Sequence, residues 1–208
     1  MLQRIKQNFE ALSPNITGCI KNLSNTDSLE ALSDLLEEDL PDDLIQFYSE
    51  FTGNDNVPLE NFVYGTCFHS LQTCLSRAES QAETDSNPNV PDYPLEFSGP
   101  EIDSRYTFNR SRVEIGHDWG TYLLCVDFTP TKYGNFGQII MLDYDVSKAF
   151  VIAGSISELM DQFSEDLINK KYELTSTNRN GYWLEPKAEI DLANWHISPS
   201  RWSHVKLS

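Results

Sequence analysis

The sequence predicts an α+β fold, in which helices flank a central, mostly antiparallel sheet of about four to six strands. Apolar residues recur at helical spacing in the first part of the chain and again in its last third, which is typical of amphipathic helices. Between these segments lie runs rich in aromatic and β-branched residues, which are typical of strands. Two of the runs are separated by a short loop containing Pro and Gly, and this pattern predicts a β-hairpin.

Three helices are expected near the start of the chain. The first covers Leu2 to about Leu12 and carries a single apolar stripe. The second begins with Asp27 as its N-cap, and Glu30 follows three residues later as a capping box requires. The third begins at Pro41, which fits the first helical position because its missing N–H costs nothing there, and we expect Gly53 to close this helix.

The next segment is expected to contain one strand, one helix and a long loop. Asn61–Gly65 is predicted as a short strand and Ser70–Ala82 as a helix. From about Glu83 to Pro100 four prolines stand among Asp, Asn, Ser and Gly, which favours an exposed loop over regular structure. We interpret this stretch as an insertion inside the domain. Arg110–Ile115 is then predicted to resume the sheet.

The predicted hairpin forms the centre of the sheet. Its strands are Tyr122–Phe128 and Gly137–Leu142, and a last strand follows over Ala149–Ala153. Ser155 then precedes a clean apolar stripe over Ile156–Asn169, which predicts a helix with Ser155 as its N-cap.

Length and composition predict one domain with an appendage. The chain has 208 residues, of which 39% are hydrophobic, and this is enough to fill a single core. We assign residues 1–174 to the domain and residues 175–208 to a C-terminal extension. The extension contains Trp183, Trp195 and Trp202, so it is too aromatic for a disordered tail, and we expect it to pack on the domain or to dock on a partner.

The charge is strongly negative and unevenly distributed. The formal net charge is −17, and no Lys or Arg lies between Lys21 and Arg77. Such a surface repels nucleic acids and anionic membranes and attracts a basic partner, although it can equally serve only to keep a protein soluble. We therefore expect neither nucleic acid nor membrane as a partner. The acidic residues in this gap are Asp27, Glu30, Asp34, Glu37, Glu38, Asp39, Asp42, Asp43, Glu50, Asp55 and Glu60.

The sequence predicts a cytoplasmic protein with reduced thiols. No apolar stretch has the length of a membrane span, and the first residues lack the apolar region of a signal peptide. The four cysteines show no C-x-x-C spacing and stand in mostly apolar surroundings, which favours buried, unpaired side chains. They are Cys19, Cys67, Cys74 and Cys125.

No catalytic, cofactor or metal-binding motif is recognisable. Nucleotide-binding and nucleophile-elbow motifs are absent from the sequence, and the four histidines do not stand at the spacings of zinc ligands. His117 and Asp118 are adjacent, but neighbouring residues of a strand point to opposite sides, which argues against an acid–base pair. We therefore expect a protein that is not an enzyme, with neither a cofactor nor a metal.

Asp127 is the clearest candidate for a structural polar residue. It stands between Val126 and Phe128 in a strand, where its carboxylate needs hydrogen-bond partners because an unpaired buried charge is costly. Backbone N–H groups of the following loop or the Gln138 amide can supply them. We assign Asp127, Gly137 and Gln138 a structural or pocket-forming role.

Four pieces of the sequence, in this order, resemble the Smi1/Knr4 (SUKH) family. Leu40–Tyr48 resembles its Leu-Pro opening helix, and Gly120–Asp127 resembles a family strand that begins with Gly-x-Tyr and ends in Asp. Gly137–Ile140 reads Gly-Gln-Ile-Ile after a Gly-containing loop, and Val151–Leu167 resembles the closing strand and helix. The resemblance covers about Asp27–Leu174.

The resemblance implies a binding function. Known members are mainly bacterial immunity proteins that bind and neutralise a cognate toxin, often a nuclease, and fungal regulatory scaffolds. It implies a non-catalytic immunity protein for a toxin domain, and the negative charge independently favours a basic one. From the charge pattern we expect Glu37, Glu38, Asp39, Asp42 and Asp43 to steer the partner, and we expect Trp119 and Tyr122 to anchor it unless these aromatics pack in the core. The alternatives are a regulatory scaffold, or a small-ligand pocket around Trp119, Asp127 and Gln138.

Overall fold

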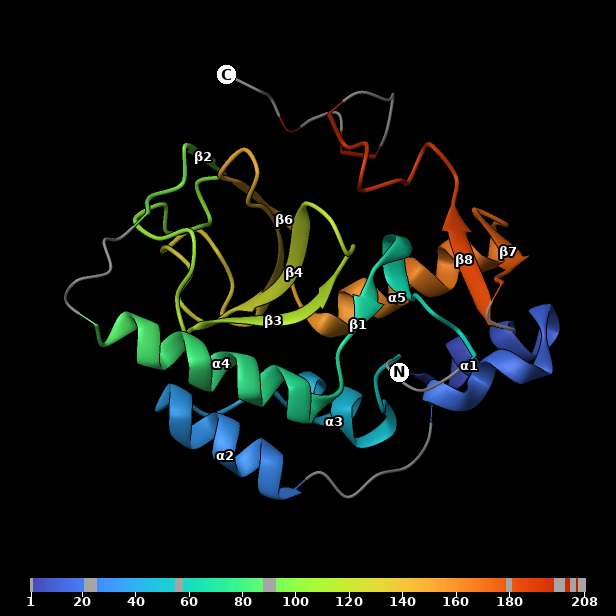
Figure 1. Cartoon of the computed structure of the whole chain (residues 1–208), viewed down its shortest axis with the longest axis horizontal. Coiled ribbons are helices and arrows are strands. Elements are labelled where there is room, and N and C mark those ends of the chain that lie inside the picture. Colours follow the sequence, from blue (N-terminus) through green and yellow to red (C-terminus); the bar gives the residue numbers. More distant parts are fainter. Residues whose placement is uncertain are drawn as a thin grey trace.

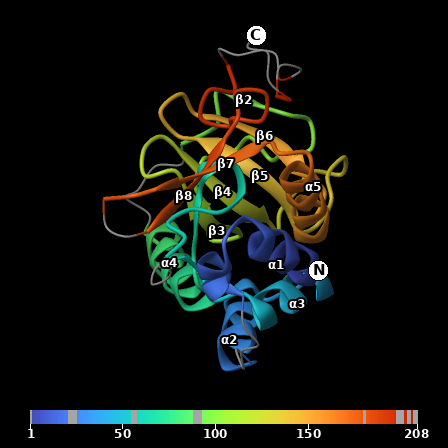
Figure 2. The ribbon, with the colours of Figure 1, turned by 90° about the vertical axis from the view of Figure 1, so that its right-hand side faces the viewer.

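The computed structural model describes residues 2–20, 26–54, 58–87, 93–178, 181–196, 201–202 and 205. Within these ranges it confirms the α+β class, with five α-helices, a six-stranded sheet and a separate two-stranded sheet (Figure 1). Figure 2 shows the N-terminal helices gathered on one side of the large sheet.

The three expected N-terminal helices are present as α1 (Leu2–Leu12), α2 (Thr26–Leu36) and α3 (Asp42–Glu50). Each has an amphipathic pattern, and most apolar residues of each helix pack in the core, whereas Leu12 and Ile45 are exposed. Helix α4 (Leu71–Asp85) runs alongside α2, and the two helices form a pair beneath the sheet in the view of Figure 1.

Three predicted helix boundaries were wrong by one to a few residues. Asp27 lies inside the first turn of α2 and so is not its N-cap. Pro41 precedes α3 because its ψ of 138° is extended, although its carbonyl already accepts hydrogen bonds from the first turn. The helix also ends before Gly53, because Phe51 is extended and forms a β-bridge with Ile20.

The predicted strand Asn61–Gly65 was also wrong. This segment turns in a 3-10 helix, Val63–Gly65, and the strand β1 (Cys67–Phe68) comes only after it. The reason is the Asn61 side chain, which donates to the Leu184 carbonyl at 2.9 Å and accepts from the Leu184 N–H at 2.7 Å. A side-chain amide thus replaces the backbone pairing that a strand would need.

The predicted loop from about residue 83 to 100 contains more regular structure than expected. Helix α4 continues to Asp85, whose carboxylate accepts from the Arg110 N–H at 2.8 Å. Strand β2 (Phe97–Ser98) pairs in parallel with β6 (Lys148–Ala153) at the sheet edge. Residues 88–92 of this stretch lie outside the described residues.

The remaining predicted strands are confirmed to within one or two residues as β3 (Arg112–His117), β4 (Tyr122–Asp127), β5 (Gln138–Asp143) and β6. The strand order is β1-β3-β4-β5-β6-β2, and every neighbouring pair except β6 and β2 is antiparallel. All six residues of β5 are buried, because both faces of the sheet are covered.

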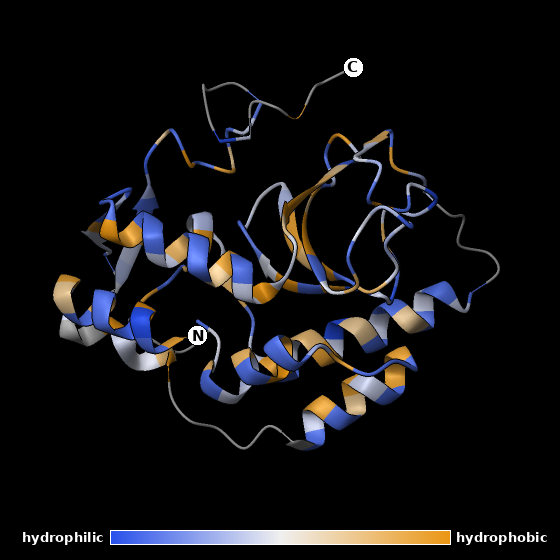
Figure 3. Cartoon of the chain, turned by 180° about the vertical axis from the view of Figure 1, so that it is seen from behind, coloured by the Kyte–Doolittle hydropathy of each residue, from blue (hydrophilic) through white to orange (hydrophobic). Residues whose placement is uncertain are grey.

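The main core lies between one face of the sheet and the helices, including α5 (Ile156–Ile168). Ser155 caps α5 by accepting from the Glu158 N–H at 3.3 Å, as expected. The strands appear as an apolar layer flanked by helices with alternating polar and apolar faces (Figure 3). A smaller cluster covers the other sheet face, formed by Leu95, Ile102, Cys125, Ile140, Leu142 and Ala149.

The C-terminal segment packs into the main core. It begins with the hairpin of β7 (Tyr172–Ser176) and β8 (Tyr182–Pro186), and the expected boundary at residue 174 falls within β7. Trp195 and Trp202 are each only 3% exposed, and their rings lie 5.2 and 6.0 Å from that of Phe150 on β6. The described part of this segment is therefore continuous with the domain.

The burial of Trp195 predicts a large stability cost for its removal. Trp195→Ala should lower the free energy of unfolding by about 3–5 kcal/mol, because it leaves a large cavity and removes the donor to the Asp143 carboxylate. Trp119→Ala is the matched control, since Trp119 is 69% exposed and its removal should cost less than about 0.5 kcal/mol. Urea denaturation checks both values, and equal costs would contradict the packing of the tail.

Candidate functional site

Four of the five acidic residues expected to steer a partner are exposed. Glu37, Glu38 and Asp39 follow α2, and Asp42 opens α3. We call these four residues the acidic corner. The Arg110 guanidinium lies 3.7 Å from the Glu37 carboxylate, but both side chains are largely exposed, so solvent screens this pair. The corner therefore presents a concentration of unneutralised negative charge.

Asp43 has a different environment from the acidic corner. It is half-buried, and its Oδ2 accepts from the Ser157 N–H at 3.0 Å in the first turn of α5. A carboxylate at a helix N-terminus is stabilised by the helix dipole. Asp43 thus joins α3 to α5, and the geometry assigns it a structural role in place of the expected steering role.

Trp119 is the exposed aromatic of the loop between β3 and β4. The loop is held by Asp118, whose Oδ1 accepts from the backbone N–H groups of Gly120 and Thr121, each at 2.9 Å. Trp119 has a φ of 66°, which is unusual for a non-glycine residue, and its indole packs against the His117 ring at a tilt of 43°, with the ring centres 4.3 Å apart. The indole is therefore presented to solvent in a defined position.

Tyr122 does not share this exposure. Only 1% of it is accessible, and its hydroxyl donates to the Tyr64 carbonyl at 3.1 Å. Burial also raises the pKa of Tyr122 well above its usual value. Tyr122 is the first residue of β4, and its side chain faces the helices in the main core. The expectation that it anchors a partner was therefore wrong.

The acidic corner and Trp119 lie near opposite ends of β3. Glu37 approaches Arg110 just before the strand, whereas Trp119 follows its last residue, His117. Five residue steps along β3 correspond to roughly 17 Å. The two predicted parts of the binding surface therefore do not form one cluster, and only a partner that spans at least this distance contacts both.

Asp127 lies at the centre of a buried polar row that crosses three strands. In the sheet register Arg112 stands opposite Asp127, and Asp127 stands opposite Gln138. The carboxylate accepts from Gln138 Nε2 at 3.0 Å and from the Thr129 N–H at 3.1 Å, and the Arg112 Nε lies 4.0 Å away. Gly137 adjoins the row, since its N–H donates to the Asp127 carbonyl at 2.9 Å.

The three residues expected around one small-ligand pocket, Trp119, Asp127 and Gln138, do not all come together in the part of the chain that the structure describes. Asp127 closes β4 at one end, and Trp119 precedes its other end. Both Asp127 and Gln138 are fully buried and use their polar atoms on each other and on nearby backbone.

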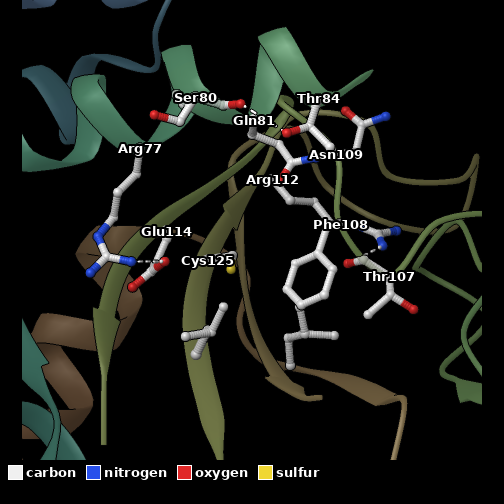
Figure 4. Close-up of a pocket in the computed structure, with 13 residues that line it drawn as sticks. Arg77, Ser80, Gln81, Thr84, Thr107, Phe108, Asn109, Arg112, Glu114 and Cys125 are labelled. Carbon is white, nitrogen blue, oxygen red and sulfur yellow. Dashed lines mark hydrogen bonds and ion pairs between the residues drawn. The ribbon is translucent and has the colours of Figure 1, made fainter. Parts of the chain in front are cut away.

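A cavity of about 430 Å³ lies between α4 and the outward face of β3, β4 and β5 (Figure 4). Figure 4 shows Arg77 and Glu114 facing each other on one side and Phe108 on the other. The Arg112 guanidinium forms part of the wall and donates to the carbonyls of Asp103, Tyr106 and Thr107. The sequence did not reveal this cavity, because its lining comes from four separate segments.

The side chains of His69, Glu114 and His117 form a polar cluster next to this cavity. His69 Nε2 lies 2.8 Å from Glu114 Oε1, and Arg77 donates to Glu114 Oε2 at 2.9 Å. The rings of His69 and His117 are 4.8 Å apart. Burial lowers the pKa of His117, and the neighbouring His69 lowers it further.

Sequence analysis missed this group for a physical reason. Glu114 and His117 are three residues apart in β3, a spacing that places side chains on opposite faces of a regular strand. The pairing of β3 with β4 contains an irregularity between Glu114 and Gly116, and such a bulge changes which side chains share a face. His69 is 45 residues distant in sequence, so no local pattern connects it to the other two.

The fold and surface define an α+β domain that exposes an acidic corner and one ordered tryptophan. A family model, the SMI1 / KNR4 family (SUKH-1), matches residues 24–162, which is more than half of the chain. The chain therefore belongs to the SMI1/KNR4 (SUKH) family. No curated protein matches it. Among the described residues, no helix is long and apolar enough to cross a membrane.

The matched region contains the surface and the buried row described above. It begins just before α2 and ends within α5, so it includes the acidic corner, Trp119 and Asp127. Helix α1, the hairpin of β7 and β8, and the two buried tail tryptophans lie outside it. These outer segments lie beyond the matched region but contribute to the same core.

Replacing Asp127 tests the buried row. Asp127→Asn should lower the free energy of unfolding by about 3 kcal/mol at neutral pH, because the single oxygen of an amide can accept from either Gln138 Nε2 or the Thr129 N–H and leaves the other buried donor unpaired. Asp145→Asn is the matched control at an exposed aspartate in the turn between β5 and β6, and its effect should stay within about 0.5 kcal/mol. A cost for Asp127→Asn as small as that of the control, measured by urea denaturation, would refute the structural role.

The effect of Asp127→Asn on stability should depend on pH. Burial raises the pKa of Asp127, while the Gln138 hydrogen bond and the Arg112 charge oppose this rise. A carboxyl group with a raised folded-state pKa contributes stability that is complete below its unfolded pKa and is lost as the pH rises through the folded value. The stability difference between wild type and Asp127→Asn should therefore widen as the pH falls from about 7 to about 4. A narrowing difference would show that the folded-state pKa is lowered.

Proposed function

We propose that this protein is an immunity protein that binds and neutralises a cognate toxin with a basic, nuclease-like domain. The observation that carries the proposal is the acidic corner within a chain of the SMI1/KNR4 family. In this proposal the protein acts in the cytoplasm by stoichiometric binding and catalyses no reaction. The family resemblance supports the class of function, and the charge supports the class of partner.

The electrostatic argument concerns how such a partner is recognised. A nuclease needs a cationic surface to hold phosphates, and that surface is complementary to a cluster of carboxylates. The described residues 26–54 and 58–76 contain no Lys or Arg to neutralise the acidic corner within its own region of sequence. Long-range attraction between the two proteins raises the rate of encounter more than it lengthens the life of the complex.

Trp119 is the best candidate for a desolvated contact, and it lies apart from the acidic corner, near the other end of β3. Asp118 holds its loop, and the Tyr144 hydroxyl donates to the Gly120 carbonyl from the neighbouring turn. A large, ordered aromatic ring loses little conformational entropy on binding, which is why Trp is enriched among binding hot spots. The proposal therefore assigns steering to the acidic corner and part of the affinity to Trp119.

Charge reversal tests the steering role. The double variant Glu38→Lys and Asp42→Lys should reduce the association rate with the partner by about tenfold at low salt, and the difference should shrink as salt is added. The partner is first captured on the tagged chain at low salt and eluted with rising salt, and association rates are then measured with the purified partner by stopped flow or surface plasmon resonance.

The matched control reverses two exposed glutamates elsewhere. Glu173→Lys and Glu185→Lys change the net charge equally, and these residues stand opposite each other on the β7–β8 hairpin. If both double variants slow association equally, only net charge matters and the acidic corner is not the contact surface. A captured partner that is not toxic when expressed alone would contradict the immunity function itself.

A further inference from the structure

The group of His69, Glu114 and His117 has the composition of a metal site. The nitrogen and oxygen donor atoms that these three side chains offer all lie within 4.8 Å of one another. Two imidazoles and one carboxylate are a typical protein ligand set for Zn²⁺ when the fourth position remains open. Tetrahedral bonds of about 2.0–2.1 Å place ligands about 3.4 Å apart, so movements of about 1 Å bring the three side chains into coordination distance.

The fold brings these residues together from two elements. Strand β1 pairs with the end of β3, where Cys67 stands opposite His117, and the His69 N–H continues the pairing by donating to the Ile115 carbonyl at 2.8 Å. His69 also directly precedes Ser70, the N-cap of α4. Its backbone is therefore held on both sides.

The irregularity in β3 positions the other two ligands. Glu114 and His117 approach the same histidine because the β3–β4 register shifts between Glu114 and Gly116. Gly116 permits the close approach of β1, since a Cβ there would lie 2.9 Å from the Cys67 carbonyl oxygen. A regular strand with a larger residue at this position would separate the three side chains.

The hydrogen bonding of His69 supplies an independent observation. The side chain is 3% exposed, and its Nδ1 is buried without a hydrogen-bond partner among the described residues. Buried polar nitrogens are normally satisfied, and an unpaired one calls for an explanation, such as a bound water or ion. A purely structural His69–Glu114 hydrogen bond accounts for Nε2 and leaves Nδ1 available to a ligand.

Arg77 completes the surroundings of the group. It holds Glu114 Oε2 while Oε1 faces His69, an arrangement that fixes the carboxylate as outer hydrogen bonds do in metal sites. Arg77 is also positively charged and only partly exposed, so its repulsion limits the affinity for a second cation. The expected affinity is therefore that of an exchangeable site, weaker than that of a structural zinc site.

We propose that His69, Glu114 and His117 bind one Zn²⁺ ion at the edge of the sheet, with a fourth coordination position open to water or to a side chain of a partner. This proposal does not depend on the immunity function, because it rests on the geometry of three side chains alone.

Co²⁺ and Zn²⁺ titrations of the full, untagged chain test the site. We expect one Co²⁺ per chain with visible absorption bands of low-coordinate cobalt, displacement by Zn²⁺, and a Zn²⁺ dissociation constant on the order of micromolar in competition with a chelating dye. Binding of Co²⁺ should also quench part of the tryptophan fluorescence, because Trp119 packs against His117.

Variants distinguish the site from adventitious binding. His117→Ala and Glu114→Gln should each weaken Zn²⁺ binding by at least about tenfold. His117→Gln serves as a second variant if the alanine form is unstable, as judged by circular dichroism. His196→Ala, at an exposed histidine outside the group, should leave the affinity unchanged.

Several binding results would overturn the proposal. They are the absence of 1:1 binding by the wild-type chain, unchanged affinity in folded His117 variants, and an equal loss of affinity in His196→Ala. An intense near-ultraviolet charge-transfer band with Co²⁺ would indicate thiolate ligands and would likewise exclude this donor set.

Discussion

The buried row of Arg112, Asp127 and Gln138 is the constraint on which the rest of the structure depends. These residues stand opposite one another on β3, β4 and β5, so a register slip of one residue on any strand would separate a buried charge from its partners. Each member also holds a loop. Arg112 binds three carbonyls between residues 103 and 107, Asp127 binds the Thr129 N–H, and Gln138 binds Asn135 and Glu101. The row thereby sets the sheet register, and its Arg112 also forms part of the cavity wall.

The helical side of the sheet depends on contributions from both ends of the chain. Helix α1 packs against α5, and the tail tryptophans pack on Phe150, so segments outside the family match complete the same core. Trp195 Nε1 donates to Asp143, the last residue of β5, and links the tail to the central strand. The exposed acidic corner and the Trp119 loop are consequently supported by a continuous packed interior.

Much of the fold was predictable because it follows local periodicity, whereas the sites depend on long-range contacts. The apolar stripes of α1 and α5 identified both helices closely, and the central strands were located to within two residues. The strand predicted over Asn61–Gly65 was wrong because the Asn61 side chain hydrogen-bonds to the backbone of Leu184, which is 123 residues away in sequence. From the sequence, both Trp119 and Tyr122 were candidates for anchoring a partner. The structure separates them, because Trp119 lies in the turn before β4 and is exposed, whereas Tyr122 begins β4 and is buried. The three-ligand group depends on a strand irregularity and on His69, neither of which leaves a signature in local spacing.

The central claim is that the protein neutralises a toxic partner by covering it. The measurement that tests this most directly is a titration of the purified partner's toxic activity, nuclease activity in the expected case, with increasing amounts of the protein. The account predicts that activity falls linearly to zero at one chain per partner and returns when high salt dissociates the complex. Inactivation of many partners by one chain would show catalysis, and undiminished activity at excess protein would show that binding does not neutralise; either result would contradict the account.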